Sequence, residues 1–346
     1  MFWKGCVPVL TALAAGWMAA ACADREKVSD FAAPTALRAD SIAIHQIIKP
    51  ERWTTGNGKA IILQGFGADS LFYVYSMPDF RFLYTWGARG EGPGEFPRGA
   101  KLDDMYYGDV DSLLIEERNT LRAYRADDAG FELLHERPVP RSKLFVTRYS
   151  LPYGFTGERK APSQEKEVEY FYVRRIGDQA GVTDSLRLNT RTETQYAQSG
   201  HAYQQRQFNP ASPVVRGHRL AFVYRHIRHV DFYDLSPEGR LTPVASVGDP
   251  VDDDALARIQ HSQDDPSWWA GSMTATDEYL YVLWGKSGEA PELPVVCVYD
   301  WNGREVRAYR LEKQATDILV ARDDSRLYTR NGYEDFDQVY VYDISE

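Results

Sequence analysis

Cysteine is scarce in this chain, with three residues in 346, and two of them, Cys6 and Cys22, lie close to the N-terminus. Cys297 is therefore the single cysteine in the body of the chain, which excludes an internal disulfide framework. It lies on an alternating apolar stretch, so we expect a buried, inert thiol. Neither a Gly-x-Ser-x-Gly elbow nor an HExxH motif is present, and this lack favours a non-enzymatic protein.

Positive charge is also in deficit, with 40 Lys and Arg against 50 Asp and Glu and a net charge of −10. Nucleic-acid binding needs a positive face, so we expect no nucleic-acid partner. Electrostatic adhesion to anionic headgroups is disfavoured for the same reason. Aromatic residues, in contrast, make up 13% of the chain, and Gly and Pro interrupt it at short intervals. That composition is typical of a β-rich domain with many turns.

The longest apolar run, Val7–Ala21, is 15 residues long and follows the basic Lys4. A spanning helix needs about 20 apolar residues, so this run is typical of a signal peptide covering residues 1–21. It ends in three alanines followed by Cys22, an arrangement that resembles a bacterial lipobox. The resemblance implies lipidation of Cys22 and a location in the cell envelope, anchored to a membrane on its periplasmic face or at the cell surface. The net charge becomes −11 when Lys4 is removed with the signal peptide.

Residues 22–40 are polar and Ala-rich and are interpreted as a tether. From residue 41 onward, short β-patterns alternate with Gly, Asp, Asn and Pro, and only Asp252–Gln260 suggests a short helix. A parallel α/β fold would need a helix between successive strands, so an all-β class is favoured. We place the folded domain at residues 41–346.

A repeat appears when strands that end in an aromatic residue are aligned. Six such anchors lie between 43 and 66 residues apart: Tyr75, Tyr124, Tyr172, Tyr233, Tyr299 and Tyr342. A second register supports the repeat, since the segment Asp277–Tyr281 recurs as Asp324–Tyr328. Periods of this length in an all-β chain predict a six-bladed β-propeller. The last sheet is expected to borrow a strand from the region around Ser41–Ile48, which would close the ring. Five or seven blades, or a β-sandwich, stay open as alternatives.

The segment Trp86–Pro97 contains four glycines and resembles the Gly-rich loop of NHL-type repeats. Its glycines permit tight backbone approach, and Phe96 is expected to fill the gap between two blades. Together with the lipobox and the Tyr-rich body, the loop is similar to the TolB-like, six-bladed propeller lipoproteins of Bacteroidetes. The alternative is a phosphate-binding loop, but the Lys-Ser/Thr of a P-loop is missing, and no Rossmann-type unit surrounds the segment.

Two segments contain candidate site residues. In Tyr224–His229, either His226 or His229 could serve as a ligand or proton carrier near a central channel. The alternative is an exposed strand end whose charges are solvated.

The second segment begins at Asp252–Asp254 and continues with His261, Asp264 and Asp265. Carboxylates and a histidine can bind a cation, but EF-hand spacing is absent and helix capping explains the acids, so we expect no metal and no cofactor. Trp268 and Trp269 follow in the same region. They are expected either to stack on a sugar or anchor a protein, or to seal adjacent blades.

The leading hypothesis is a lipid-anchored, non-enzymatic binding or scaffold protein of the cell envelope, whose partner is an unknown protein or glycan. The alternative is an envelope hydrolase or lyase with its active site in the central channel, which rests on analogy between folds.

Overall fold

The computed structural model describes the larger part of the chain. The described residues are 33–46, 50–64, 70–90, 92, 95–96, 105–106, 112–117, 120–138, 146–160, 169–175, 181–196, 203–261, 268–286, 292–335 and 337–345.

Within these ranges the chain forms six sheets of at least four strands and one two-stranded sheet. We number the six larger sheets in chain order. Sheet 1 contains β3 (Pro50–Gly56), β4 (Lys59–Gln64), β5 (Phe72–Ser76) and β6 (Phe82–Trp86). Sheet 2 contains β7 (Met105–Tyr106), β8 (Leu113–Glu117), β9 (Thr120–Ala126) and β10 (Phe131–Pro138). Sheet 3 contains β11 (Val146–Leu151), β12 (Phe155–Lys160), β13 (Tyr170–Arg175) and β14 (Val182–Arg187).

The remaining sheets follow a two-stranded hairpin of β15 (Arg191–Tyr196) and β16 (Tyr203–Phe208). Sheet 4 contains β17 (Ala211–Arg216), β18 (Arg219–Tyr224), β19 (His229–Leu235) and β20 (Leu241–Gly248). Sheet 5 contains β21 (Trp268–Ala275), β22 (Tyr279–Lys286), β23 (Val295–Asp300) and β24 (Glu305–Arg310), with β1 (Thr35–Ala36) at its edge. Sheet 6 contains β25 (Asp317–Val320), β26 (Arg326–Arg330), β27 (Gln338–Asp343) and β2 (Asp40–Ala43).

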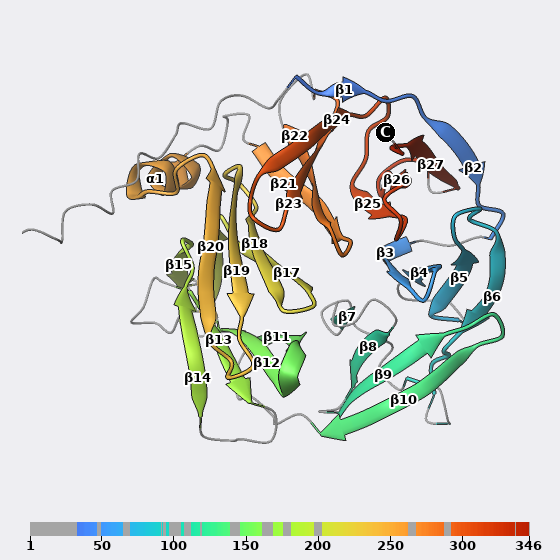
Figure 1. Cartoon of the computed structure of the whole chain (residues 1–346), viewed down its shortest axis with the longest axis horizontal. Helices are drawn as coiled ribbons and strands as arrows, with labels where there is room; N and C mark the ends of the chain where they lie inside the picture. The colour runs from blue at the N-terminus through green and yellow to red at the C-terminus, as the bar shows by residue number, and fades with distance from the viewer. Residues whose placement is uncertain are drawn as a thin grey trace, which may run out of the picture.

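The sheets stand around a common centre, with β3, β7, β17, β21 and β25 closest to it (Figure 1). These are first strands of their sheets, and β17 contacts β21, β21 contacts β25, and β25 contacts β3. Within each sheet the strands pair antiparallel in chain order from the centre outward, except that β1 and β2 from the start of the chain are added at the outer edges of sheets 5 and 6. The β-propeller predicted from the sequence is confirmed.

Each of the six aromatic anchors lies in the third strand of its sheet, namely β5, β9, β13, β19, β23 and β27. A third strand is flanked by two strands of its own sheet. In β5, β19, β23 and β27 its side chains enter apolar cores on both sides, as Val298 and Tyr299 of β23 do, and in β9 and β13 they enter at least one. This burial explains why the third strand gave the clearest repeat.

Apolar cores fill the spaces between neighbouring sheets. Such cores join sheets 1 and 2, 3 and 4, 4 and 5, 5 and 6, and 6 and 1. Phe96 belongs to the first of these and is 1% exposed, with its ring 6.0 Å from that of Phe72 and 5.6 Å from that of Trp86. The expectation that Phe96 fills a gap between two blades is confirmed.

The N-terminal segment closes the ring. β2 pairs antiparallel with β27, so the last sheet takes its fourth strand from the start of the domain, as the sequence predicted. Before that, β1 pairs in parallel with the outer edge of β24, and Leu37 packs against the core between sheets 5 and 6. In the described part of the chain, paired β-structure is thus first seen at Thr35, within the segment interpreted as the tether (residues 22–40).

The recurring Asp-x-x-Leu-Tyr segment joins consecutive sheets. Asp277 of sheet 5 forms an ion pair with Arg216 of sheet 4, with 2.8 Å between the carboxylate oxygen and the guanidinium nitrogen. Tyr281 of sheet 5 donates to Asp324 of sheet 6 at 2.8 Å, and Tyr328 of sheet 6 donates to a carbonyl of sheet 1 at 2.8 Å. The repeat therefore encodes a contact between sheets as well as a turn.

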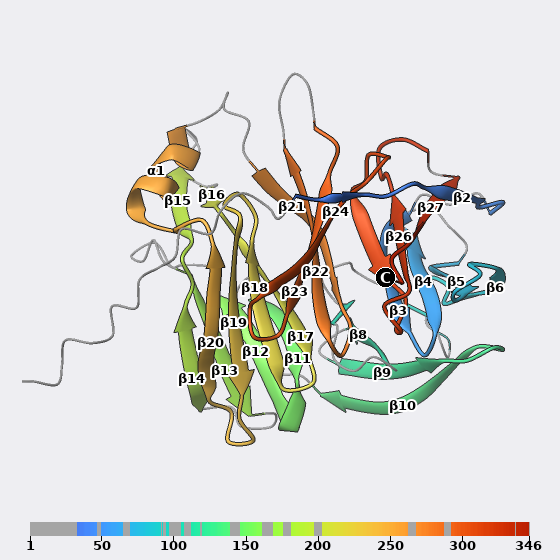
Figure 2. The ribbon, with the colours of Figure 1, turned by 45° about the horizontal axis from the view of Figure 1, so that its top comes forward.

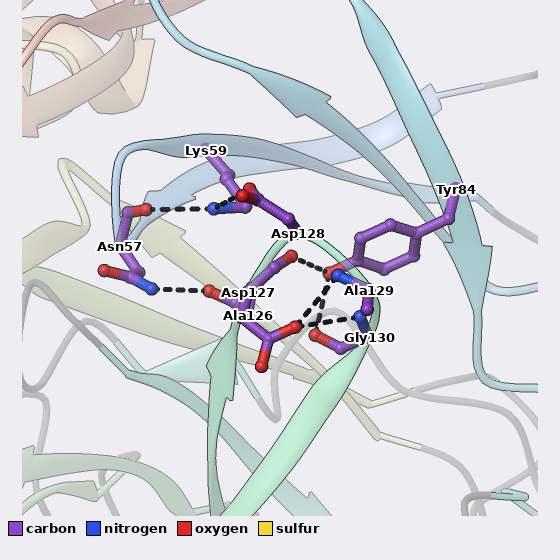
Figure 3. A network of polar contacts seen from close by, with 8 residues as sticks. All are labelled: Asn57, Lys59, Tyr84, Ala126, Asp127, Asp128, Ala129 and Gly130. Atoms are coloured by element: carbon purple, nitrogen blue, oxygen red, sulfur yellow. Dashed lines mark hydrogen bonds and ion pairs between the residues drawn. The ribbon is translucent and has the colours of Figure 1, made fainter.

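Sheets 1 and 2 are joined by a polar network at the turns of their hairpins (Figure 3). The side-chain amide of Asn57, in the β3–β4 turn, donates to the carbonyl oxygen of Ala126 at 2.8 Å. Lys59 is 8% exposed and pairs with Asp128 at 3.1 Å. The buried stem and charged tip of Lys59 thus span the two sheets.

Tyr84 extends the same network. Its hydroxyl donates to the carbonyl oxygens of Asp127 and Gly130, each at 2.8 Å (Figure 3). Burial, followed by the charges of Asp127 and Asp128, raises the pKa of Tyr84 to about 12. The phenol therefore stays protonated and keeps its role as a donor at neutral pH.

The β15–β16 hairpin and α1 (Asp253–His261) lie together beside sheet 4 (Figure 2). Asp252 caps the helix, since its carboxylate accepts the N–H of Ala255 at 2.8 Å. Ala255 and Leu256 pack on Ile227 in the turn between β18 and β19. The expected helix over Asp252–Gln260 is confirmed, and it covers one turn of the propeller.

Candidate functional site

The segment Tyr224–His229 is the end of β18, a turn, and the first residue of β19. The side-chain oxygen of Asn209 accepts the backbone N–H groups of His226 at 2.9 Å and Ile227 at 3.0 Å. Asn209 is fully buried and precedes β17, so it fixes this turn to the start of the innermost strand. The turn joins the second and third strands of sheet 4, and neither histidine lies on the innermost strand.

His229 is 6% exposed and has a partner at each ring nitrogen. Its Nδ1 lies 2.8 Å from the carbonyl oxygen of Asp249, and its Nε2 lies 3.0 Å from Oδ1 of Asp231. Both partners carry acceptor oxygens, so each ring nitrogen of His229 faces an acceptor. The sequence-based alternative of solvated charges at an exposed strand end does not describe His229, which is held inside the fold.

Asp231 is the centre of this network. Its carboxylate accepts hydrogen bonds from His229, from the hydroxyl of Ser246 at 2.7 Å, and from the hydroxyl of Tyr224 at 2.9 Å. Burial alone would raise the pKa of Asp231, but the bonds and charge of His229 and the hydroxyl donors outweigh it and hold the pKa below its usual value. Burial, and then the nearby charge of Asp231, raises the pKa of Tyr224.

The arrangement of Ser246, His229 and Asp231 differs from a catalytic triad. In a triad the serine and the carboxylate bind opposite ring nitrogens of the histidine. Here Ser246 Oγ lies 3.1 Å from Nε2, the same nitrogen that faces Asp231, and Nδ1 is taken by a backbone carbonyl. The serine proton points to Asp231, whose lowered pKa makes it a poor base. The network can hold the turn in place, but it does not activate the serine as a nucleophile.

Arg228 links this region to sheet 5. It is 8% exposed and pairs with Glu305 at 3.0 Å. Cys297 lies beside this pair with no exposed surface, and burial raises the pKa of its thiol. The expectation of a buried, unreactive cysteine agrees with this environment. Sequence reasoning missed the Arg228–Glu305 pair, because the two residues are far apart along the chain.

Trp269 lies on the innermost strand of sheet 5, directly opposite Gly285 of β22. A Cβ atom at Gly271 would lie 2.2 Å from its indole ring, and one at Gly285 would lie 2.6 Å from it. The indole therefore lies flat over two glycines, and its side chain is partly exposed. Trp268 begins β21, but its side chain lies outside the described residues, as does that of His261.

The Gly-rich loop is occupied by its own carboxylate. The N–H of Gly92 donates to Glu95 at 2.7 Å, and a Cβ at Gly90 would lie 1.9 Å from the same carboxylate oxygen. Glu95 thus takes the place where an anion would sit in a phosphate-binding loop. This contact favours the structural interpretation of the loop over the phosphate site.

Several candidates lie outside the described residues, namely Cys22, Asp264 and Asp265. Among the described residues, no group of three or more His, Cys, Asp or Glu side chains is placed to hold a metal ion. In the same part of the chain, no helix is both long and apolar enough to cross a membrane.

No family model matches the chain, and no curated protein does either. Solved structures of other proteins are similar to this chain in fold, among them the following three. A DUF4221-family member from Bacteroides vulgatus shares 9% identity at a TM-score of 0.44, over 89% of this chain and 96% of that one. The Swd1 β-propeller domain of Myceliophteria thermophila shares 8% sequence identity at a TM-score of 0.43, over 88% of this chain and 100% of that one. BamB from Moraxella catarrhalis shares 11% sequence identity at a TM-score of 0.36, over 89% of this chain and 100% of that one. At these values the comparisons carry no argument about function.

Proposed function

We propose that this protein is a bacterial cell-envelope lipoprotein, anchored through Cys22, whose propeller is a non-enzymatic binding or scaffold module for a protein or glycan partner. Support for the anchor comes from the sequence alone, where Lys4, the apolar run Val7–Ala21 and the following cysteine resemble a lipoprotein signal. We also propose that the six larger sheets are six blades of a TolB-like propeller.

The proposal that the protein is not an enzyme rests on one observation, the engagement of both ring nitrogens of His229 in structural contacts. Its two nitrogens hold Asp231 and the carbonyl of Asp249, and its ring is buried. A general base must reach a substrate proton, and His229 has no nitrogen left for one. His226 contributes its backbone N–H to the same structural turn. The imidazole of His229 is thus part of the framework, whereas the bond of His226 to the turn involves its backbone only.

The attachment of β1 supports a short distance between propeller and membrane. Thr35, where the pairing with β24 is seen, lies 13 positions after Cys22, with 12 residues between them. Fully extended, such a segment reaches about 45 Å. A lipid on Cys22 would therefore hold the propeller within about one domain diameter of the bilayer, with the edge of sheet 5 nearest to the attachment point.

One end of the propeller suits a partner best. Among the described residues, this is the end at which β17 and β21 begin and at which the connections from sheet 3 to sheet 4 and from sheet 4 to sheet 5 lie. The β15–β16 hairpin, α1 and the start of β21 are such connections, and they add surface beyond the repeated sheets. Binding proteins place recognition on loops held by a rigid scaffold, and the buried network at His229 supplies that rigidity.

Membrane fractionation tests the anchor. The wild-type chain, expressed in a bacterium that processes lipoproteins, should sediment with membranes, and Cys22→Ser should move it to the soluble fraction. Cys297→Ser is the matched control, because it removes a buried thiol and should leave the membrane association unchanged. Membrane retention of Cys22→Ser would contradict the lipid anchor.

Affinity capture tests the binding function. The detergent-solubilised chain should retain a specific protein or glycan from envelope extracts over repeated trials. Repeated failure to capture any specific partner would remove the support for a binding role. Turnover of an envelope substrate that His226→Ala or His229→Ala abolishes, with folding retained, would overturn the non-enzymatic proposal.

A further inference from the structure

Trp269 differs from the other tryptophans that the structure describes. Three of these are buried between sheets with little exposed surface: Trp53 at 3%, Trp284 at 0% and Trp301 at 5%. Trp86 stacks on Phe131 at 4.3 Å in the core between sheets 1 and 2. Trp269 is partly exposed and, unlike these four, belongs to none of the apolar cores found among the described residues. It is therefore not explained as a core residue.

The seat of this indole is built from two glycines on adjacent strands. Any side chain at Gly271 or Gly285 would collide with the ring, since their Cβ positions lie 2.2 Å and 2.6 Å from it. Neither glycine has a positive φ, so turn geometry does not require them. Their absent side chains serve to let the ring lie flat on the backbone of β21 and β22. One face of the indole is thereby fixed on the sheet, and the other is directed away from it.

The pattern of burial shows which side of sheet 5 bears the indole. Ala270 and Trp284, the sequence neighbours of Trp269 and Gly285, point into the core between sheets 4 and 5. Alternation along a strand therefore places Trp269 on the opposite side, which faces sheet 6. β21 also contacts β25 of that sheet, and Ser272 accepts the N–H of Ile318 at 3.2 Å. Trp269 thus lies between sheets 5 and 6, at the end of the propeller that we propose binds a partner.

The rim of this seam is polar and exposed. Glu292 precedes β23, and Gln314 lies between β24 and β25, and both are exposed. The side chain of Gln314 donates to the carbonyl of Glu292 at 3.4 Å, which ties the two loops together above the seam. Gln314 and Glu292 bring an amide and a carboxylate to the end of the propeller at which β21 and Trp269 begin sheet 5, and such groups recognise hydroxyls.

From this geometry we infer that Trp269 is the stacking platform of a saccharide site at the seam of sheets 5 and 6. A pyranose ring presents C–H groups on its face, which pack on an indole, and hydroxyls at its edge, which the polar rim can bind. The net charge of −10 disfavours an anionic glycan, so the occupant is a neutral saccharide. This inference deepens the proposed function, because it selects a glycan as the class of partner and places its site.

Calorimetric titration of the full chain in detergent micelles tests the inference. The probes are four neutral tetrasaccharides: β-1,4-linked glucose, α-1,4-linked glucose, β-1,4-linked mannose and β-1,4-linked N-acetylglucosamine. At least one should bind, and Trp269→Ala should weaken that binding about tenfold, the value of one aromatic contact with its buried area. Trp269→Phe should give an intermediate loss, since a smaller ring remains on the glycine seat.

Two further variants separate stacking from general damage. Gly285→Ala keeps the tryptophan but displaces its ring, and it should weaken binding about as much as Trp269→Ala. Tyr153→Ala removes an aromatic side chain that is 48% exposed in the β11–β12 turn, at the opposite end of the propeller, and it should leave binding unchanged. Urea unfolding of each variant confirms that the compared proteins are folded.

The inference fails if none of the four probes binds, or if folded Trp269→Ala or Trp269→Phe binds as tightly as the wild type. Its failure is distinguishable from failure of the proposed function. A captured protein partner and a soluble Cys22→Ser variant would keep the lipoprotein scaffold and reject the saccharide site. A saccharide that binds through Trp269, together with a Cys22→Ser variant that stays in membranes, would keep the saccharide site and reject the lipid anchor.

Discussion

Replacement of Asp231 by alanine should be the most damaging single change in the polar network of sheet 4. Asp231 is 8% exposed and His229 6% exposed, and they lie 3.0 Å apart. The substitution leaves the imidazole facing no carboxylate and removes the acceptor of the Ser246 and Tyr224 hydroxyls. Loss of one partner of a buried pair costs about 3–5 kcal/mol, because the other group stays buried and uncompensated.

The same strand offers a matched control. Asp234 also faces a histidine, His218, at 3.8 Å, but both side chains are about half exposed, at 50% and 48%. Exposed pairs contribute about 0–1 kcal/mol, so Asp234→Ala should cost no more than that. The two variants differ in burial while sharing chemistry and strand, and their difference isolates the effect of the buried environment.

Urea unfolding followed by tryptophan fluorescence gives both free energies, and its pH dependence adds a second test. Folding lowers the pKa of Asp231, so its stabilisation is present above the pKa of the unfolded chain, about 4. It should be lost as the pH falls through the folded value, and the gap between wild type and Asp231→Ala should close there. A cost below about 1 kcal/mol at pH 7, or a gap that widens in acid, would refute the reasoning.

Three further changes test other parts of the fold. Phe96→Ala should cost about 3–5 kcal/mol in urea unfolding, because it empties the core between sheets 1 and 2, whereas the exposed Phe82→Ala should cost about 1 kcal/mol. Tyr281→Phe removes a donor to Asp324 across sheets 5 and 6 and should lower the free energy of unfolding by about 1–3 kcal/mol; an unchanged midpoint would contradict that contact. Cys297 is fully buried with a raised pKa, so iodoacetamide should label it only at urea concentrations that unfold the chain; rapid labelling of the native protein would show that the thiol is accessible.

The fold could be predicted because its strongest signals are local. The third strands carry apolar side chains on both faces, and their aromatic ends, such as Tyr299 and Tyr342, recur at the spacing of whole sheets. The closing strand could be predicted because a ring of sheets leaves no open edge, and β2 does pair with β27. Phe96 was predictable because its glycine-rich surroundings allow a tight approach.

The polar network was not predictable from such signals. His229 binds a carbonyl 20 residues away, and Arg228 pairs with Glu305 at a separation of 77 residues. Buried ion pairs have no period along the chain, so the charges of this segment suggested an exposed strand end. The segment is also covered at Ile227 by α1, and such tertiary packing is not encoded in sequence patterns.

Trp269 illustrates a middle case. The sequence identified the residue and offered two roles, a partner contact or a seal between blades. Its role depends on Gly271 and Gly285, which are meaningful only once β21 and β22 are known to pair in that register. Glycines opposite a tryptophan on paired strands are a signal that could have been sought after the strands were assigned.

Mass spectrometry of the N-terminal residue, on protein purified from bacterial membranes, tests the central claim most directly. The account predicts a mature chain that begins at Cys22, with a mass increase on that residue that corresponds to attached acyl chains. An intact N-terminus at Met1, or a chain that begins at an unmodified Cys22, would contradict it.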